Sequence, residues 1–123
     1  MIPKKLVTQV LERDGGWCVI NGPACLGEAT VADHRANRGS GGSQVLNDIR
    51  CLIAACGLCN GLKEDSSRAY RAELIRRGVI VAKAATNHET VNKCANKPVE
   101  YPNESWWFLH VDGTRTELSE VPF

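Results

Sequence analysis

The chain of 123 residues contains no long apolar run, no large imbalance of charge and few aromatic residues. A membrane-spanning helix needs about 20 consecutive apolar residues, and no segment approaches that length. Lys4 and Lys5 stand where a signal peptide would have its apolar segment. We therefore expect a cytoplasmic chain that does not enter the membrane.

Neither sign of charge dominates the sequence as a whole. The 15 Lys and Arg residues face 14 Asp and Glu residues, which gives a formal net charge of +1 at pH 7. Net charge alone therefore does not drive tight binding to nucleic acid. Residues 35–83 nevertheless hold nine basic and four acidic side chains, and the segment after them is acidic. This basic middle could face phosphates or form an ordinary solvated surface.

The 6 cysteines are too few for a small secreted scaffold held by disulfides, which contains roughly 8 to 10% cysteine. Cys56-Gly-Leu-Cys59 has the spacing with which two thiolates bind one tetrahedral ion. Cys18 and Cys25 are the obvious further ligands, because Asn21-Gly22-Pro23 between them can turn the chain back. We therefore predict a structural zinc site held by four thiolates, those of Cys18, Cys25, Cys56 and Cys59.

The residue pattern predicts an α+β fold in a single domain over residues 1–123. Helices are expected at 3–13, 59–65 and 66–77, strands at 29–34 and 79–82, and a C-terminal β-hairpin within 99–121. The segments 35–48 and 84–98 are polar and without pattern, which predicts loops. The apolar run at 51–56 fits either a buried strand or the lead into a helix.

Several other conspicuous side chains have structural explanations. Asp112-Gly113 predicts a tight primed turn between the two strands of the hairpin. The aromatic run at 106–108 could stack on bases, but core packing explains it better because the chain has few other large residues. Solvated or packed structural roles are expected for the remaining histidines and cysteines, which are His88, His110, Cys51 and Cys94.

An ordered set of polar residues accompanies the cysteines. Asp33-His34 ends the first predicted strand, and Asn60 directly follows Cys59. A histidine can act as a general base near neutral pH, while Asp and Asn oxygens suit a hard cation such as Mg²⁺ or Mn²⁺. Taken alone, the Asp-His pair could be a surface pair without function, and Asn60 could be a helix cap.

The segment from Arg13 to Glu64 resembles the zinc-bearing HNH endonucleases common in bacteria and their phages. A cysteine pair, Asp-His, Gly-Gly, Asn, and CxxC followed by His or Asn occur in the order of that family, over about 50 of the 123 residues. Asn60 in the last position makes the chain similar to the HNN subset. The sequence departs from the family at the middle Asn, because Cys51 occupies its usual place and Asn47 lies four residues upstream.

The resemblance implies a small ββα-metal (His-Me finger) core at 13–65, a helix and strand extension at 66–83 and a C-terminal hairpin at 99–121. It implies hydrolysis of DNA phosphodiester bonds, by nicking or by double-strand cleavage, with His34 as the general base. Asp33 and Asn60 would hold one Mg²⁺ or Mn²⁺, and Asn47 would orient the loop of the base. The expected contacts to DNA are Arg35, Arg38, Lys63, Arg68 and Arg71.

Two other functions fit the same residues. A zinc-ribbon module that binds DNA without catalysis would need the cysteines and the basic residues but not His34. An accessory protein could instead use its acidic C-terminal region to dock on a phage packaging assembly. The resemblance indicates a bacterial cell or a phage-infected host, and it leaves the DNA specificity, the pathway and the oligomeric state open.

Overall fold

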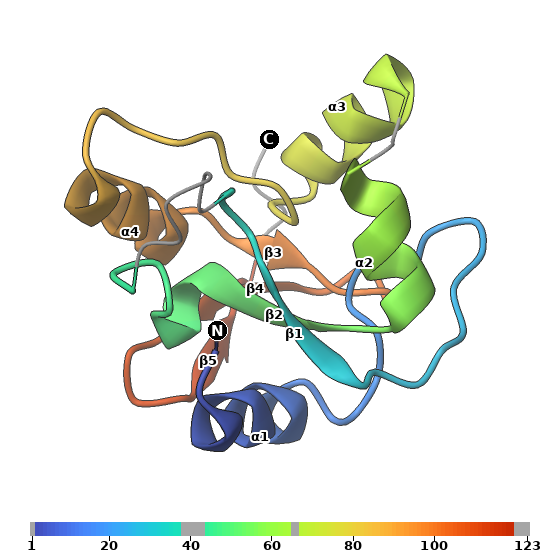
Figure 1. Cartoon of the computed structure of the whole chain (residues 1–123), viewed down its shortest axis with the longest axis horizontal. Coiled ribbons are helices and arrows are strands. Elements are labelled where there is room, and N and C mark those ends of the chain that lie inside the picture. The colour runs from blue at the N-terminus through green and yellow to red at the C-terminus, as the bar shows by residue number, and fades with distance from the viewer. Residues whose placement is uncertain (1, 38–43, 65–66, 120–123) are drawn as a thin grey trace.

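Two antiparallel strands and the helix after them form the centre of the chain. In the computed structural model, which describes residues 2–37, 44–64 and 67–119, β1 (Val31–His34) pairs with β2 (Leu52–Ala55), and α2 (Gly57–Glu64) follows β2 directly (Figure 1). His34 lies opposite Leu52 in this pairing. The apolar run at 51–56 contains β2, so it forms a strand rather than only the lead into a helix. All of β2 is buried.

The other elements surround this centre and confirm an α+β fold with an N-terminal helix. The helices are α1 (Lys4–Arg13), α3 (Arg68–Arg76) and α4 (Asn87–Asn96), and the 3₁₀ turn η1 (Ile49–Cys51) leads into β2. A second antiparallel sheet contains β3 (Val99–Glu100), β4 (Trp106–Leu109) and β5 (Arg115–Glu117). In the part of the chain that the structure describes, no helix has the length and apolar character needed to cross a bilayer.

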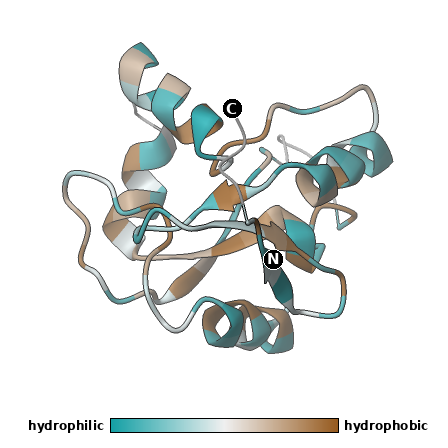
Figure 2. Ribbon diagram, turned by 180° about the vertical axis from the view of Figure 1, so that it is seen from behind, coloured by the Kyte–Doolittle hydropathy of each residue, from teal (hydrophilic) through white to brown (hydrophobic). Residues whose placement is uncertain are grey.

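The apolar side chains form one large core and one smaller cluster. Val10 of α1, Ile53 of β2, Leu74 of α3 and Leu109 of β4 are fully buried in the large core, and Figure 2 shows the central strands coloured mainly as hydrophobic. The smaller cluster packs α4 against the residues that follow β1, the residues that precede β2 and the segment at 79–82. Its members are Ala36, Leu46, Cys51, Val81, Val91 and Cys94, so both cysteines are buried as predicted.

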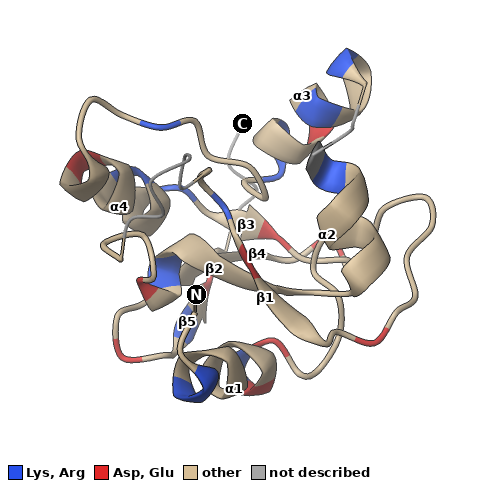
Figure 3. Cartoon of the chain, in the orientation of Figure 1, with Lys and Arg blue, Asp and Glu red and all other residues tan. Residues whose placement is uncertain are grey.

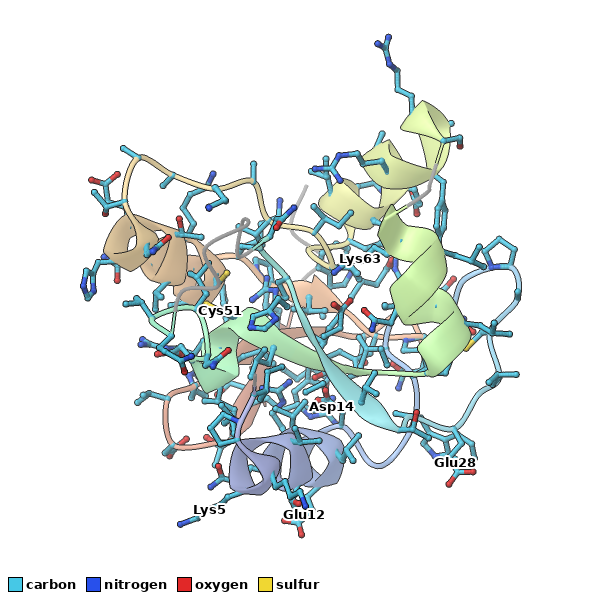
Figure 4. The ribbon with its side chains drawn as sticks, viewed as in Figure 1. Lys5, Glu12, Asp14, Glu28, Cys51 and Lys63 are labelled. Atoms are coloured by element: carbon cyan, nitrogen blue, oxygen red, sulfur yellow. The ribbon has the colours of Figure 1, made fainter. Side chains whose placement is uncertain are left out.

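A buried ion pair fastens α1 to both sheets. Arg13 Nε donates to Asp14 Oδ1 at 2.9 Å, and Arg13 Nη2 donates to the Leu52 carbonyl at 2.6 Å. Asp14 Oδ2 accepts the Ala54 N–H at 2.9 Å, and the Tyr101 hydroxyl donates to Oδ1. Figure 4 shows Asp14 between α1 and the central strands. Because both charges are paired and hydrogen-bonded, their burial is tolerated.

Two sequence predictions in the second half of the chain are wrong. Residues 84–98 contain α4 rather than only a loop: the Thr86 hydroxyl accepts the Glu89 N–H at 3.1 Å, the N-terminal half of a capping box. Residues 79–82 do not form a strand. That segment instead passes alongside the end of β1, where the Val81 N–H donates to the Arg35 carbonyl at 2.9 Å.

The turn of the C-terminal hairpin also differs from the prediction. β4 and β5 pair as expected, with Leu109 opposite Arg115. A primed turn requires positive φ at its central residues, whereas Val111 and Asp112 lack it and only Gly113 has it, at 87°. The Gly113 N–H donates to the His110 carbonyl at 3.1 Å, so a non-primed turn precedes the glycine.

Candidate functional site

The four predicted zinc ligands converge on one point. The sulfur atoms of Cys18, Cys25, Cys56 and Cys59 all lie within 4.8 Å of one another. A tetrahedral zinc ion with bonds of about 2.3 Å separates its sulfur ligands by roughly 3.8 Å, so the cluster is close to that size. The cluster could therefore hold a structural metal such as zinc, as the cysteine spacing predicts.

The loop between the first two cysteines is shaped to approach the second pair. Asn21 adopts a left-handed φ of 49°, which turns the chain after Cys18. At Gly22 an added Cβ would lie 2.3 Å from Tyr70 Oη and 3.6 Å from Cys59 Sγ. A side chain at this position would displace the Tyr70 hydroxyl and touch Cys59 Sγ, so glycine lets the loop lie close to α3 and to the second cysteine pair.

Backbone amides surround these sulfur atoms as hydrogen-bond donors. The N–H groups of Gly22 and Leu26 point to Cys59 Sγ and Cys56 Sγ at 3.3 and 3.5 Å, and the Cys59 N–H points to Cys56 Sγ at 3.4 Å. Burial raises the pKa of Cys56, but the Leu26 and Cys59 amides, together with hydrogen bonds from the Cys59 and Cys18 thiols, lower that pKa to about 6. The loop thus stabilises a thiolate, which is the form that binds metal.

A pocket of about 430 Å³ opens where β1 ends. Asp33 and His34 line one side of it, Lys63 of α2 and Arg71 of α3 line another, and residues 80–83 complete it. Asp33 is buried and His34 is half-buried. The sequence singles out the Asp-His pair, and the structure brings that pair to a concave site lined by both charged and apolar side chains.

Asn47 holds the His34 ring. His34 Nε2 lies 2.8 Å from Asn47 Oδ1, and Asn47 Nδ2 donates to Gln44 Oε1 at 3.1 Å. A carbonyl oxygen only accepts, so this contact suits a ring that carries a proton on Nε2; in the neutral form of that ring, Nδ1 has the lone pair. Asn47 thus contacts the ring of the proposed base itself, whereas the prediction was an asparagine that orients the backbone of the loop of the base. Cys51 is buried in the smaller core cluster.

Asp33 faces a lysine of α2. Lys63 Nζ lies 2.6 Å from Asp33 Oδ2 and donates to the His34 carbonyl at 2.6 Å. Figure 4 shows Lys63 between α2 and β1. The predicted role of Lys63 was a contact to DNA phosphate, whereas its ammonium group lies against groups of the protein.

Asn60 lies one turn before Lys63 on α2 and is half-buried. Residues three apart on a helix share a face, so Asn60 lies on the side of α2 from which Lys63 reaches Asp33. Asn60 is nevertheless not among the described residues that line the pocket. The structure thus brings Asp33, His34 and Asn47 together and leaves Asn60 at the margin of the site.

The predicted DNA-contacting arginines have different positions. Arg35 is fully buried, and its guanidinium donates to carbonyl oxygens of the protein, so it does not fit a role as a phosphate contact. Arg68 and Arg71 are exposed on α3, and Figure 3 shows positive charge at the end of α2 and along α3. Arg71 lines the pocket, and Arg38 lies outside the described residues.

Sequence reasoning missed Lys83, an exposed lysine that also lines the pocket. No local pattern marks it, because it reaches the site only through the packing of residues 79–83 beside β1. His88 on α4 and His110 after β4 do not line the pocket, and His110 Nε2 lies 2.6 Å from Thr116 Oγ1. Trp106 is buried and the Arg115 guanidinium covers Trp107 at 3.9 Å, so core packing explains both tryptophans.

Comparison with protein-family models, curated proteins and solved structures finds no match for this chain. The resemblance to HNH endonucleases consequently depends on the motif residues alone. What the site can do has to be argued from its own geometry and chemistry.

Proposed function

We propose that this chain is a metal-dependent endonuclease that hydrolyses DNA phosphodiester bonds. One observation carries the proposal: a histidine at a strand end, oriented by Asn47 at 2.8 Å, stands next to a buried aspartate over an open pocket. Positioned acid–base and oxygen-ligand groups of this kind suit hydrolysis of a phosphodiester. The antiparallel pair β1–β2 followed by α2 agrees with the order of elements that a ββα-metal core requires.

His34 has the role of general base in this proposal. The Nε2 proton is held by Asn47, so His34 Nδ1 accepts a proton from the attacking water. The backbone of His34 is fixed on both sides, by Lys63 at its carbonyl and by pairing of β1 with β2. The ring is thereby oriented before substrate binds, which lowers the cost of reaching the reactive geometry.

Asp33 and Asn60 would hold the divalent ion. Their carboxylate and amide oxygens are the ligands that Mg²⁺ and Mn²⁺ prefer, and the Asp33 carboxylate lines the same pocket as His34. When bound, such an ion neutralises charge on the phosphate and on the leaving oxygen. Asn60 would join the site from the face of α2 that Lys63 also occupies.

The cysteine cluster would act at a distance, by fixing the elements that carry the site. Cys56 joins β2 to α2, and Cys18 and Cys25 belong to the loop that precedes β1. A zinc ion bound to all four would therefore lock β1, β2 and α2 together. Arg71 and Lys83 both line the pocket and are exposed, and they would contact the DNA backbone, which positions it without reading its sequence.

Conversion of supercoiled plasmid to open-circular and linear forms tests this function. The zinc-loaded protein is expected to cut with Mg²⁺ or Mn²⁺ and to stop when EDTA is present. Retained zinc and DNA binding without cleavage under any metal would contradict the proposal. That outcome would instead favour a zinc-ribbon module that binds DNA, which needs the cysteine cluster and exposed cations such as Arg71 but no base.

A further inference from the structure

Building on the proposed function, we propose that Lys63 weakens the hold of Asp33 on a divalent ion, as a resident positive charge in the metal site, rather than contacting DNA. Its ammonium group holds the Asp33 carboxylate in place, and a divalent ion binds Asp33 against this resident positive charge. The role concerns the metal site itself, and it separates Lys63 from the phosphate-contacting cations Arg71 and Lys83.

Burial and distance support this role. The side chains of Lys63 and Asp33 are only 6% and 9% exposed, and Nζ lies 2.6 Å from Asp33 Oδ2. Lysine and aspartate are almost never buried to this degree unless they are paired. The same ammonium donates to the His34 carbonyl at 2.6 Å, so one side chain of α2 holds both residues at the end of β1.

The exposed cations of the pocket differ from Lys63 in this respect. Arg71 and Lys83 reach the pocket from exposed positions, where their charges can meet a phosphate. The Lys63 ammonium is directed at a carboxylate and a carbonyl of the protein. Loss of Lys63 should therefore alter the metal site, whereas loss of Lys83 should alter binding of DNA.

The electrostatic consequence has a definite sign. An ion with two positive charges that shares the Asp33 carboxylate with an ammonium is repelled by it, and this repulsion is stronger in a buried site than in water. Removing the ammonium charge should therefore tighten binding of the divalent ion, by roughly tenfold or more. A lysine whose ammonium lay away from the ion would produce no such gain.

Mn²⁺ binding to the zinc-loaded full chain, measured by electron paramagnetic resonance without DNA, tests this inference. Lys63→Met is expected to bind Mn²⁺ at least about tenfold more tightly than wild type. Lys83→Met, which removes one charge from the same pocket, serves as the matched control and should stay within about twofold of wild type. Unchanged or weaker binding by Lys63→Met, an equal gain in both variants, or no binding by any of the three proteins would overturn the inference.

A measurement on wild type keeps the inference testable if Lys63→Met does not fold. In an NMR titration of the zinc-loaded protein with Mg²⁺, the side-chain Cε and Nζ signals of Lys63 should shift with saturation of the ion. The corresponding signals of Lys83 should shift much less. An unmoved Lys63 signal at saturating Mg²⁺ would contradict a shared carboxylate.

These outcomes are distinguishable from failure of the proposed function. Both measurements are made without DNA. If the protein shows the Lys63 effect but never cuts plasmid, the inference about the metal site stands and the proposed nuclease function fails. If wild type cuts plasmid while Lys63→Met binds Mn²⁺ like wild type, the nuclease function stands and the proposed role of Lys63 fails.

Discussion

His34 owes its orientation to a residue thirteen positions away in the sequence. The Asn47 carbonyl oxygen lies 2.8 Å from His34 Nε2, and the Asn47 amide is itself fixed by Gln44 at 3.1 Å. Cys51, where HNH endonucleases usually have their middle asparagine, contributes to the smaller core cluster instead. At this scale the site depends on two polar side chains, Gln44 and Asn47, that orient the His34 imidazole.

We predict that Asn47→Ala lowers kcat for DNA cleavage by about 10- to 100-fold, because the ring loses the partner that orients it. The KM for DNA should change little, since the contact of Asn47 with His34 orients the proposed base rather than the DNA. Steady-state cleavage of a labelled duplex separates the two parameters. Gln44→Ala, which removes only the support of the Asn47 amide, should cost less, and a wild-type rate in Asn47→Ala would refute the orienting role.

The elements around the site are joined by Arg35, which follows His34 directly. Its guanidinium donates to the carbonyls of Gly78, Arg50, Cys94 and Lys97 at 2.7 to 2.9 Å. These carbonyls belong to the end of the α3 segment, η1, α4 and the residue after α4. One buried side chain therefore satisfies acceptors from three separate parts of the fold.

We predict that Arg35→Met lowers the free energy of unfolding by about 3 kcal/mol or more, because four buried carbonyls lose their donors. Urea denaturation of the zinc-loaded protein measures the effect. Arg68→Met, which changes an exposed arginine on α3, is the control and should remain within about 0.5 kcal/mol of wild type. Similar losses in both variants would show that Arg35 does not have this joining role.

Local patterns predicted the elements that have strong local signals. The helices expected at 3–13 and 66–77 and the strand expected at 29–34 overlap α1, α3 and β1. α4 was missed because its composition is polar, although Thr86 and Glu89 offered a capping signal. Residues 79–82 were taken for a strand because an apolar β-branched run reports burial, and burial alone does not determine pairing.

The parts of the site that have local sequence signals were predictable, and the parts that depend on long-range packing were not. Cysteine spacing and the adjacent Asp33-His34 pair pointed to the cluster and to the pocket, because both signals are local. The inward direction of Lys63, the burial of Arg35 and the presence of Lys83 result from packing between segments that are distant in sequence. No property of a single residue or of its neighbours distinguishes such lysines and arginines from ordinary surface cations.

At the scale of the whole molecule, a metal held by the cysteine cluster would couple metal binding to folding. Cys56 has a pKa lowered to about 6 in the folded chain, against about 8.5 for an unperturbed thiol. A lowered pKa contributes stability that is full above the unfolded value and is lost as pH falls through the folded value. Protons also compete with metal for thiolates, so both effects have the same sign.

We predict that the zinc-loaded protein melts at a lower temperature at pH 6 than at pH 8, and that a strong chelator unfolds it. Cys56→Ser should lose the metal and unfold. Cys94→Ala, which changes a buried cysteine outside the cluster, should retain the metal and show the same decline between pH 8 and 6. Thermal melting with a colorimetric zinc assay measures both quantities, and a chelated protein with an unchanged melting temperature would refute the coupling.

The most direct test of the account is plasmid cleavage by His34→Ala beside His88→Ala, at saturating Mg²⁺ or Mn²⁺. His88 is an exposed histidine on α4 away from the pocket, so its loss controls for removal of an imidazole. The account predicts that His34→Ala retains zinc and its fold while its cleavage rate falls by about 10²- to 10⁴-fold, and that His88→Ala cuts like wild type. A folded His34→Ala protein that cuts as fast as wild type would contradict the assignment of the base.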